Sequence, residues 1–209
     1  MESNSFDYNK LDFNSICGIK LNDKMDYTGV EIEPLWAFKA FDVQKDSIVG
    51  FIGAMEVKIA NMKDLKDVKE EAEYEVPISS KRAINFIVEH FDNNDLKTTY
   101  LRQRMLVNIV KEVIELKAGI KILKTGDDLY YNGKKLSVCI ACKGITSGKI
   151  HLGINITSEG TPEHVSAIGL LEMGVSESDL TDILESILTE YCTEIDKIER
   201  DIRKTLPLI

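Results

Sequence analysis

Residues 120–157 most constrain the fold of this chain, because three runs of alternating apolar and polar residues follow one another closely there. The runs are "IKILKTGDDLYY", "KKLSVCIACK" and "KIHLGINIT". Alternation with a period of two is typical of β-strands that bury one face. Asn132-Gly133 separates the first two runs and favours a two-residue hairpin turn, since both positions tolerate positive φ. The segment therefore predicts three consecutive antiparallel strands.

The turns between these strands determine which side chains share a face. The hairpin turn pairs Asp128 with Ser137, and direct closure of the connection "GITSG" pairs Ser137 with Asn155, unless a bulge shifts the register. With this register one face is apolar, and its members are Leu129, Leu136, Val138, Ile140, Ile150, Leu152, Ile154 and Ile156. The opposite face holds Asp128, Tyr130, Lys135, Ser137, Cys139, Ala141, His151, Gly153 and Asn155.

The second face combines small residues with single charged or hydrogen-bonding residues. A sheet face that is simply exposed to solvent usually carries long polar and β-branched side chains, and an exposed face is the alternative interpretation. Small side chains, with Gly153 among them, let a ligand approach the backbone closely. We therefore predict that this face is the floor of a pocket into which Lys135 and Asp128 point.

Other segments predict further helices and strands. "SSKRAINFIVEHF" begins with a serine suited to capping and has helical apolar spacing, which predicts a helix. "LRQRMLVNIVKEVIELKAG" has the same spacing and is predicted to end at Gly119. "DSIVGFIGAMEVKIA" predicts two strands or one bent strand. The highly charged "MKDLKDVKEEAEYEVP" is expected to be a solvated loop, and His90 and His164 are expected at the surface or at helix ends.

The C-terminal segment predicts the longest helix, which Ser176 is expected to cap. Its apolar residues fall at positions 180, 184, 187, 191, 195, 198 and 202, and this spacing forms one stripe along the helix. The stripe predicts a helix that packs on the sheet. A homodimer formed through the helix is the alternative.

These elements together predict an α+β fold, with a mixed, largely antiparallel sheet and helices packed on one face. Residues 1–14 are polar and are expected to form a flexible N-terminal tail. Residues 15–209 are expected to form a single domain that ends in the long helix. A chain of 209 residues with 44% hydrophobic residues is large enough for one sizeable core.

Charge and hydropathy exclude several function classes. The formal net charge is −9, whereas general nucleic-acid binding needs a basic surface that neutralises phosphates. No apolar run approaches the roughly 18 residues of a membrane span, and "MESNSFDYNK" lacks the basic-then-apolar order of a signal peptide. The sequence therefore predicts a cytoplasmic protein with neither a membrane nor a nucleic acid as its general partner.

The four cysteines do not predict a metal site. "CIAC" resembles a metal-binding or redox motif, but no second cysteine pair or histidine cluster completes it. Cysteines three apart on one strand also point to opposite faces, which places them beyond disulfide reach. We expect neither zinc nor a disulfide. Cys17 and Cys139 are candidate acyl acceptors only if their pKa values are lowered.

The segment "LKTGDDLYYNGKKLSVCIACKGITSGKIHLGINIT" resembles the central segment of biotin protein ligases and lipoate ligases. In that superfamily an Asn-Asp pair opens a strand, a turn leads to a lysine before a strand of small residues, and a later strand ends in Gly-Ile-Asn. The resemblance implies that Lys135 contacts an acyl carbonyl or acyl phosphate and that Asp128 orients the ligand or its adenylate. An ammonium at that place stabilises the charge that develops on oxygen during acyl transfer.

The catalytic candidate is therefore Lys135. The candidate ligand-binding residues, which combine the resemblance with the predicted polar face, are Asp127, Asp128, Ser137, His151 and Asn155.

The chain departs from the ligase pattern at two places. Asp127 replaces the asparagine of the Asn-Asp pair, and the glycine-rich adenylate loop has no clear counterpart, "GFIGAM" being the one candidate. Over most of its length the chain also resembles an archaeal protein family of unknown function. That pattern reads here as "DYTGVEIEPLWAFKAF", "GDDLYYNGKKLSVCIA" and "KIHLGINI".

Two functions follow as hypotheses. The first is a domain that binds a small carboxylate, acyl or acyl-nucleotide ligand and transfers the acyl group with the help of Lys135. The second is a non-catalytic binding or scaffolding module that has lost the nucleotide loop. The sequence leaves open which cofactor is used, ATP included, and which ligand and acceptor are used.

Overall fold

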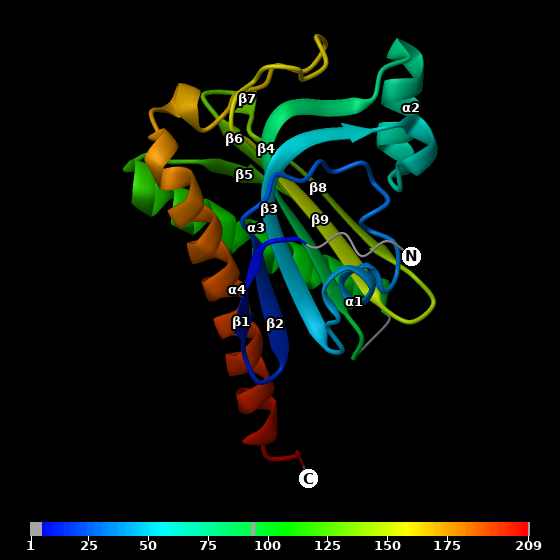
Figure 1. Ribbon diagram of the computed structural model, residues 1–209, viewed down its shortest axis with the longest axis vertical. Helices are drawn as coiled ribbons and strands as arrows, with labels where there is room; N and C mark the ends of the chain where they lie inside the picture. Colours follow the sequence, from blue (N-terminus) through cyan, green and yellow to red (C-terminus); the bar gives the residue numbers. More distant parts are fainter. Residues whose placement is uncertain (1–5, 93–94, 209) are drawn as a thin grey trace.

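The computed structural model describes residues 6–92 and 95–208 and shows a mixed six-stranded sheet with two long helices against one face (Figure 1). The strands follow one another across the sheet as β1 (Tyr8–Asp12), β2 (Ile16–Leu21), β3 (Asp46–Val57), β4 (Ile78–His90), β9 (Gly148–Asn155) and β8 (Ser137–Lys143). Neighbouring strands are antiparallel, except that β2 and β3 are parallel. The predicted α+β fold with a largely antiparallel sheet is confirmed.

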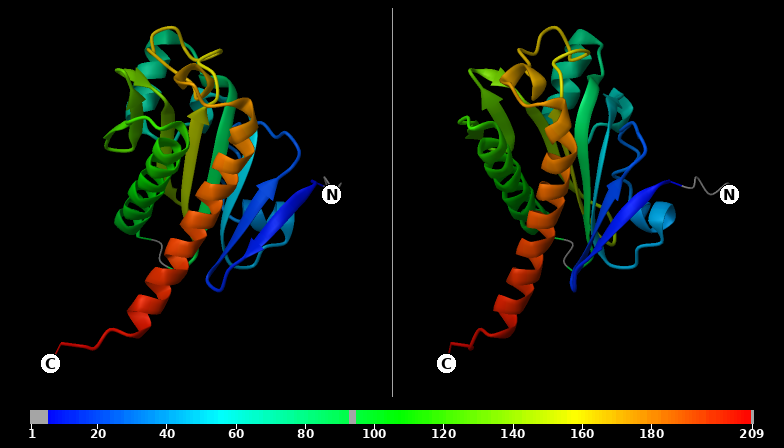
Figure 2. Two further views of the ribbon diagram at one scale, coloured as in Figure 1. Left: turned by 90° about the vertical axis from the view of Figure 1, so that its left-hand side faces the viewer. Right: turned by 60° about the vertical axis from the view of Figure 1, so that its left-hand side comes forward.

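The two long helices cover one face of the sheet and enclose the larger core (Figure 2). They are α3 (Leu96–Ala118) and α4 (Leu180–Arg203). Helix α3 is capped by the Asp95 side chain and ends at Gly119, whose φ of 65° suits glycine, as predicted. The short helix α1 (Trp36–Phe41) belongs to a smaller core on the opposite face.

The apolar stripe of α4 packs against the protein's own sheet as predicted. Ile187 is fully buried and Ile195 is 5% exposed, whereas Ile198 and Ile202 at the far end are exposed. That end extends beyond the sheet in both views of Figure 2. Ser176 caps the short 3-10 helix η3 (Glu177–Asp179) that leads into α4. No helix in the described part of the chain has the length and apolar character that a membrane crossing demands.

The helix predicted for "SSKRAINFIVEHF" is wrong, because these residues form most of the central strand β4. The run from Ala83 to Val88, apolar except for Asn85, is buried on both sides: Ile84 and Phe86 belong to the core under the long helices, and Ile87 belongs to the core on the other face. A strand that is buried on both faces has a continuous apolar run, and a continuous run also contains helical spacings.

The predicted register between the last two strands is wrong by one residue. Lys143 pairs with Gly148, so the connection has four residues, and the backbone N–H of Gly144 donates to Ser147 O at 2.8 Å. Ser137 therefore pairs with Ile154, not with Asn155. A shift of one residue moves every side chain of β8 to the other face. Cys139 and Ala141 consequently lie in the core under α3, and Val138 and Ile140 take their place opposite.

The predicted Asn-Gly hairpin is confirmed in a small second sheet. This sheet consists of β5 (Leu123–Thr125), β6 (Asp128–Tyr131) and β7 (Lys134–Lys135). Tyr130 pairs with Lys135 as expected, and Asn132 and Gly133 have φ values of 50° and 77°. Both values lie in the left-handed region that this turn requires.

Three further expectations differ from the structure. Part of the expected flexible tail, residues 8–12, forms β1 and pairs with β2, while residues 1–5 lie outside the described residues. The expected charged loop contains the 10-residue helix α2 (Leu65–Tyr74), preceded by the 3-10 turn η1 (Ile59–Asn61). "GFIGAM" is not a loop but part of β3, where a Cβ on Gly53 would lie 1.8 Å from the carbonyl oxygen of Met25.

Candidate functional site

A cavity of about 390 Å³ lies beside the β6–β7 hairpin, and four of the predicted site residues line it. These four are Asp128, Lys135, Ser137 and Asn155. Helix α2 supplies another wall, and residues 161–167 complete the lining. The strand ends, the hairpin and helix α2 thus meet around one space, as a ligand pocket requires.

Lys135 is the cation that the hairpin places in this cavity. Its ammonium lies 3.0 Å from Oδ1 of Asp128, and the Tyr130 hydroxyl donates to Oδ2 of the same carboxylate at 3.2 Å. Burial alone would lower the pKa of Lys135, but Asp128, together with Tyr130 and Asp67, more than offsets burial, so that the pKa is raised. The lysine is therefore held charged at the cavity, whereas its neighbour Lys134 is exposed.

The backbone of Lys135 is held by the segment that follows β9. Its N–H donates to the carbonyl oxygen of Ser166 at 2.8 Å, and its carbonyl oxygen accepts from Ile168 N–H at 2.9 Å. This parallel bridge brings residues 161–167 over the hairpin. The position of the lysine consequently depends on two segments that are distant in the sequence.

Ser137 and Asn155 lie at the cavity, but their polar groups already have protein partners. The Ser137 hydroxyl accepts a hydrogen bond from Leu129 N–H at 3.1 Å, and the Asn155 amide donates to Ile168 O at 3.3 Å. Ser137 is 2% exposed and Asn155 is 8% exposed. Both residues therefore shape and stiffen the cavity in this structure.

Asp127 is separated from the cavity, although it is adjacent to Asp128 in the sequence. Its carboxylate accepts from the Gln103 amide at 2.9 Å and lies 3.3 Å from the Arg104 guanidinium. Both partners belong to α3, on the side of the long helices. Asp127 belongs to the turn between β5 and β6, whereas Asp128 is the first residue of β6, and the two aspartates separate there.

His151 lines a second, smaller cavity of about 30 Å³. Its ring stacks on Tyr27 with centroids 3.5 Å apart, and its Nε2 lies 3.1 Å from Asn85 Oδ1. Burial lowers the pKa of His151 to about 3, so the imidazole is neutral at physiological pH. Met55 and Val138 border both cavities, so His151 lies close to the main cavity without lining it.

The acidic wall that α2 supplies was missed by the sequence analysis. Asp67 and Glu71 line the cavity, and His164 faces them from the opposite segment, with Nε2 3.4 Å from Glu71 Oε1. The His164 ring also stacks on Tyr74 with centroids 4.0 Å apart, which joins the two walls. The available signal was Asp64, whose side chain caps α2, before a run rich in the good helix formers Lys, Glu and Ala.

The cysteines are free thiols without signs of activation. Cys17 and Cys139 are buried, and burial raises the pKa of each thiol. A raised pKa keeps the thiol protonated and therefore a poor nucleophile. The geometry does not support either residue as an acyl acceptor.

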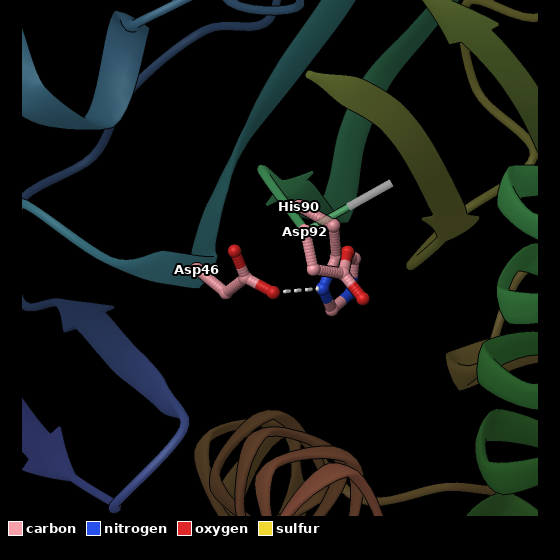
Figure 3. A group of neighbouring side chains, drawn as sticks. All are labelled: Asp46, His90 and Asp92. Carbon is pink, nitrogen blue, oxygen red and sulfur yellow. Dashed lines mark hydrogen bonds and ion pairs between the residues drawn. The ribbon is translucent and has the colours of Figure 1, made fainter. Parts of the chain in front are cut away.

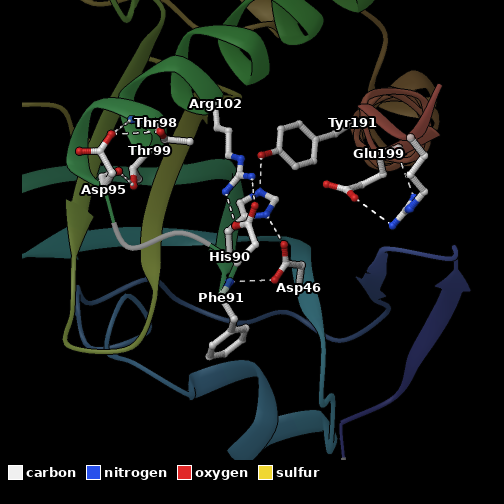
Figure 4. Close-up of polar contacts among 11 residues, drawn as sticks. Asp46, His90, Phe91, Asp95, Thr98, Thr99, Arg102, Tyr191 and Glu199 are labelled. Atoms are coloured by element: carbon white, nitrogen blue, oxygen red, sulfur yellow. Dashed lines mark hydrogen bonds and ion pairs between the residues drawn. The ribbon is translucent and has the colours of Figure 1, made fainter. Parts of the chain in front are cut away.

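A separate polar cluster joins the ends of β3 and β4 and contains Asp46, His90 and Asp92 (Figure 3). In the described residues their ligand-type atoms lie within 4.8 Å of one another, the spacing of a metal site. However, His90 Nδ1 lies 2.6 Å from Asp46 Oδ2 and Nε2 lies 2.8 Å from the Tyr191 hydroxyl (Figure 4). Arg102 binds both oxygens of Asp92. The protein itself satisfies these groups, and buried His90 connects the sheet to α4 instead of lying at the surface as expected.

The fold described above is that of biotin protein ligases. The structure of biotin protein ligase from Aquifex aeolicus in complex with biotin and ATP matches with a TM-score of 0.54 and 18% sequence identity, covering 88% of this chain and 71% of that one. The match confirms the expected ligase-like fold.

More similar proteins define the family. A protein of unknown function from Pyrococcus horikoshi has 31% identity and a TM-score of 0.84, covering 93% of this chain and all of that one. An uncharacterised protein of Methanocaldococcus jannaschii is 60% identical over 203 residues, which are 97% of this chain and 90% of that protein. Residues 17–206 match the family described as Domain of unknown function (DUF366), and the chain belongs to this family. The expected resemblance to an archaeal family is thereby confirmed.

Proposed function

We propose that this protein binds a small carboxylate, acyl or acyl-nucleotide ligand in the cavity beside Lys135 and transfers its acyl group. The observation that carries the proposal is a charged lysine at a cavity of about 390 Å³, on a fold that biotin protein ligases share. A cavity of this size suits a small organic ligand. The ligand class comes from the likeness of the central segment to the ligases, and it is part of the proposal.

Each lining residue has a chemical task in this proposal. Lys135 donates hydrogen bonds to the acyl carbonyl or acyl phosphate and stabilises the negative charge that develops on its oxygen. Asp128 holds the ammonium in place through their 3.0 Å contact, and Tyr130 in turn orients Asp128. Asn155 and Ser137 fix the cavity floor. His151 is neutral and acts behind the floor, not on the reacting atoms.

The location of "GFIGAM" is relevant to whether the protein uses a nucleotide. The one sequence candidate for a glycine-rich adenylate loop lies inside β3, where Gly50 and Gly53 are buried, permit close packing and have no access to a phosphate. A preformed acyl donor, such as an acyl thioester or an acyl adenylate, therefore agrees better with these residues than adenylation in the same site. A binding module without turnover is the second candidate. It is favoured by the finding that "GFIGAM" forms part of a strand and not an adenylate loop.

One experiment separates the two candidates. Purified protein is incubated with acyl thioesters and, separately, with carboxylates plus ATP, and product formation and ligand binding are both measured. Acyl transfer that Lys135→Met abolishes supports the enzyme. Saturable binding that depends on Lys135 without turnover supports the binding module. If neither binding nor turnover depends on Lys135, both candidates are wrong.

A further inference from the structure

The charged residues around the cavity do not balance one another. The cavity is lined by two lysines and four carboxylates, and these are Lys66, Lys135, Asp67, Glu70, Glu71 and Asp128. Lys135 pairs with Asp128 at 3.0 Å, and Lys66 pairs with Glu70 at 3.5 Å. Asp67 and Glu71 thus form no ion pair with a lysine or arginine in the described part of the chain.

These two carboxylates lie on one face of α2. They are four residues apart, which places them on successive turns of the helix and turns both toward the cavity. Like charges at this spacing destabilise a helix slightly, and burial adds a desolvation cost that Lys135 offsets only in part at Asp67. Burial, with nearby Asp64 adding to it, raises the pKa of Asp67 to about 6. The arrangement is unfavourable for the protein by itself.

Glu71 provides the second observation. It is 6% exposed, and its Oε2 is buried without a hydrogen-bond partner, while Oε1 has His164 at 3.4 Å. Buried carboxylate oxygens normally have partners, so an oxygen without one, on a residue that lines a cavity, indicates a missing donor. An ammonium carries three donors and a positive charge, and it can therefore satisfy Glu71 and Asp67 together.

From this geometry we propose that the ligand of the cavity carries a primary ammonium group, which binds between Asp67 and Glu71, in addition to its acyl or carboxylate end. The part of this inference that concerns the acyl end of the ligand rests on the function proposed above for Lys135. The substrate class is then an amino acid or aminoacyl compound with a separated amine. A purely apolar acyl chain would leave the Glu71 oxygen unsatisfied. The two ends are recognised by opposite charges on two walls of one cavity, the β6–β7 hairpin and α2.

The test measures binding of two matched series of probes by calorimetry. One series is linear ω-amino carboxylates of increasing length, and the other is ω-hydroxy carboxylates of the same lengths. We expect an amino compound to bind about tenfold more tightly, or better, than its hydroxy counterpart, because only the ammonium carries the positive charge that the two carboxylates bind. A tenfold difference in affinity corresponds to about 1.4 kcal/mol. This preference should disappear in Glu71→Gln, shrink in Asp67→Asn and persist in Glu73→Gln, an exposed position on the same helix.

Other results of this experiment would overturn the ammonium site or separate it from the role of Lys135. The inference is overturned if the hydroxy series binds as tightly, if the preference survives Glu71→Gln, or if no probe of either series binds. Thermal unfolding reports whether Glu71→Gln is folded, and Asp67→Asn carries the test if it is not. Lys135→Met should weaken both series equally. If it weakens neither while the preference still depends on Glu71, the ammonium site stands and the role of Lys135 falls.

Discussion

The ammonium of Lys135 lies 3.0 Å from the carboxylate of Asp128, across a hairpin that turns at Asn132 and Gly133. The two side chains are each about one-third exposed, at the edge of the cavity. The pair is therefore neither a solvated surface ion pair nor a buried structural one. A ligand oxygen can reach the lysine while the aspartate keeps it charged and in place.

Lys135→Met tests this arrangement directly. Methionine retains much of the apolar stem but removes the charge, so the protein should fold with nearly unchanged stability. We expect ligand affinity to fall by about 1.5–3 kcal/mol, the value of a hydrogen bond to a charged group. Lys134→Met is the matched control, because Lys134 is exposed and does not line the cavity. Equal losses in a binding titration of both variants would show that the cavity is not the site.

Asp128→Asn should lower the pKa of Lys135. In the wild type, burial lowers this pKa, and Asp128, with Tyr130 and Asp67, raises it by more; without the Asp128 carboxylate the main opposition to burial is removed. The measurement is a pH titration of the lysine side-chain signals by NMR, with Lys134 as the internal reference. An unchanged titration of Lys135 would mean that the ion pair is absent in solution.

His151 should make the protein sensitive to acid. Its pKa is about 3 when folded, well below the value of about 6.5 for an unfolded chain. Between these values the unfolded state binds more protons, so stability is complete above about pH 6.5 and decreases as the pH falls toward about 3. His151→Gln removes the titrating group and should flatten this slope, as followed by denaturant unfolding at several pH values. Because the variant also loses the stacking on Tyr27, the slopes are compared and not the absolute stabilities.

Replacements along α4 should distinguish its buried part from its free end. Ile187→Ala should cost about 2–5 kcal/mol in the free energy of unfolding, since the side chain is fully buried. Ile202→Ala, where the side chain is 62% exposed, should cost less than about 0.5 kcal/mol. Chemical denaturation measures both. A large loss at Ile202 that varied with protein concentration would indicate that a second copy covers this end.

All four cysteines should react as thiols when the protein is denatured without reductant. None of them is disulfide-bonded in the structure, and Cys139 and Cys142 lie on opposite faces of β8. A colorimetric thiol assay gives the count. Finding two thiols would instead demonstrate a disulfide.

The sequence by itself was sufficient where structure is decided by nearby residues. The alternation within residues 128–156 identified strands, Asn132-Gly133 identified the turn, and the spacing in α3 and α4 identified both long helices. Each of these signals acts over one turn or one strand, within which backbone geometry dictates the pattern. The pairing of Tyr130 with Lys135, and with it the position of Lys135 in the hairpin, followed from such local rules.

The tertiary structure decided the features that depend on which distant segments pack against or pair with a given segment. The apolar run of β4 is a strand because neighbouring strands pair with both of its edges and separate cores cover both of its faces. A turn shorter by one residue between Lys143 and Gly148 reversed the two faces of β8 and moved Cys139 into the core. Asp67 and Glu71 reached the cavity only because α2 folds over it. Burial and long-range pairing are shared between segments distant in the chain, and no local pattern encodes them.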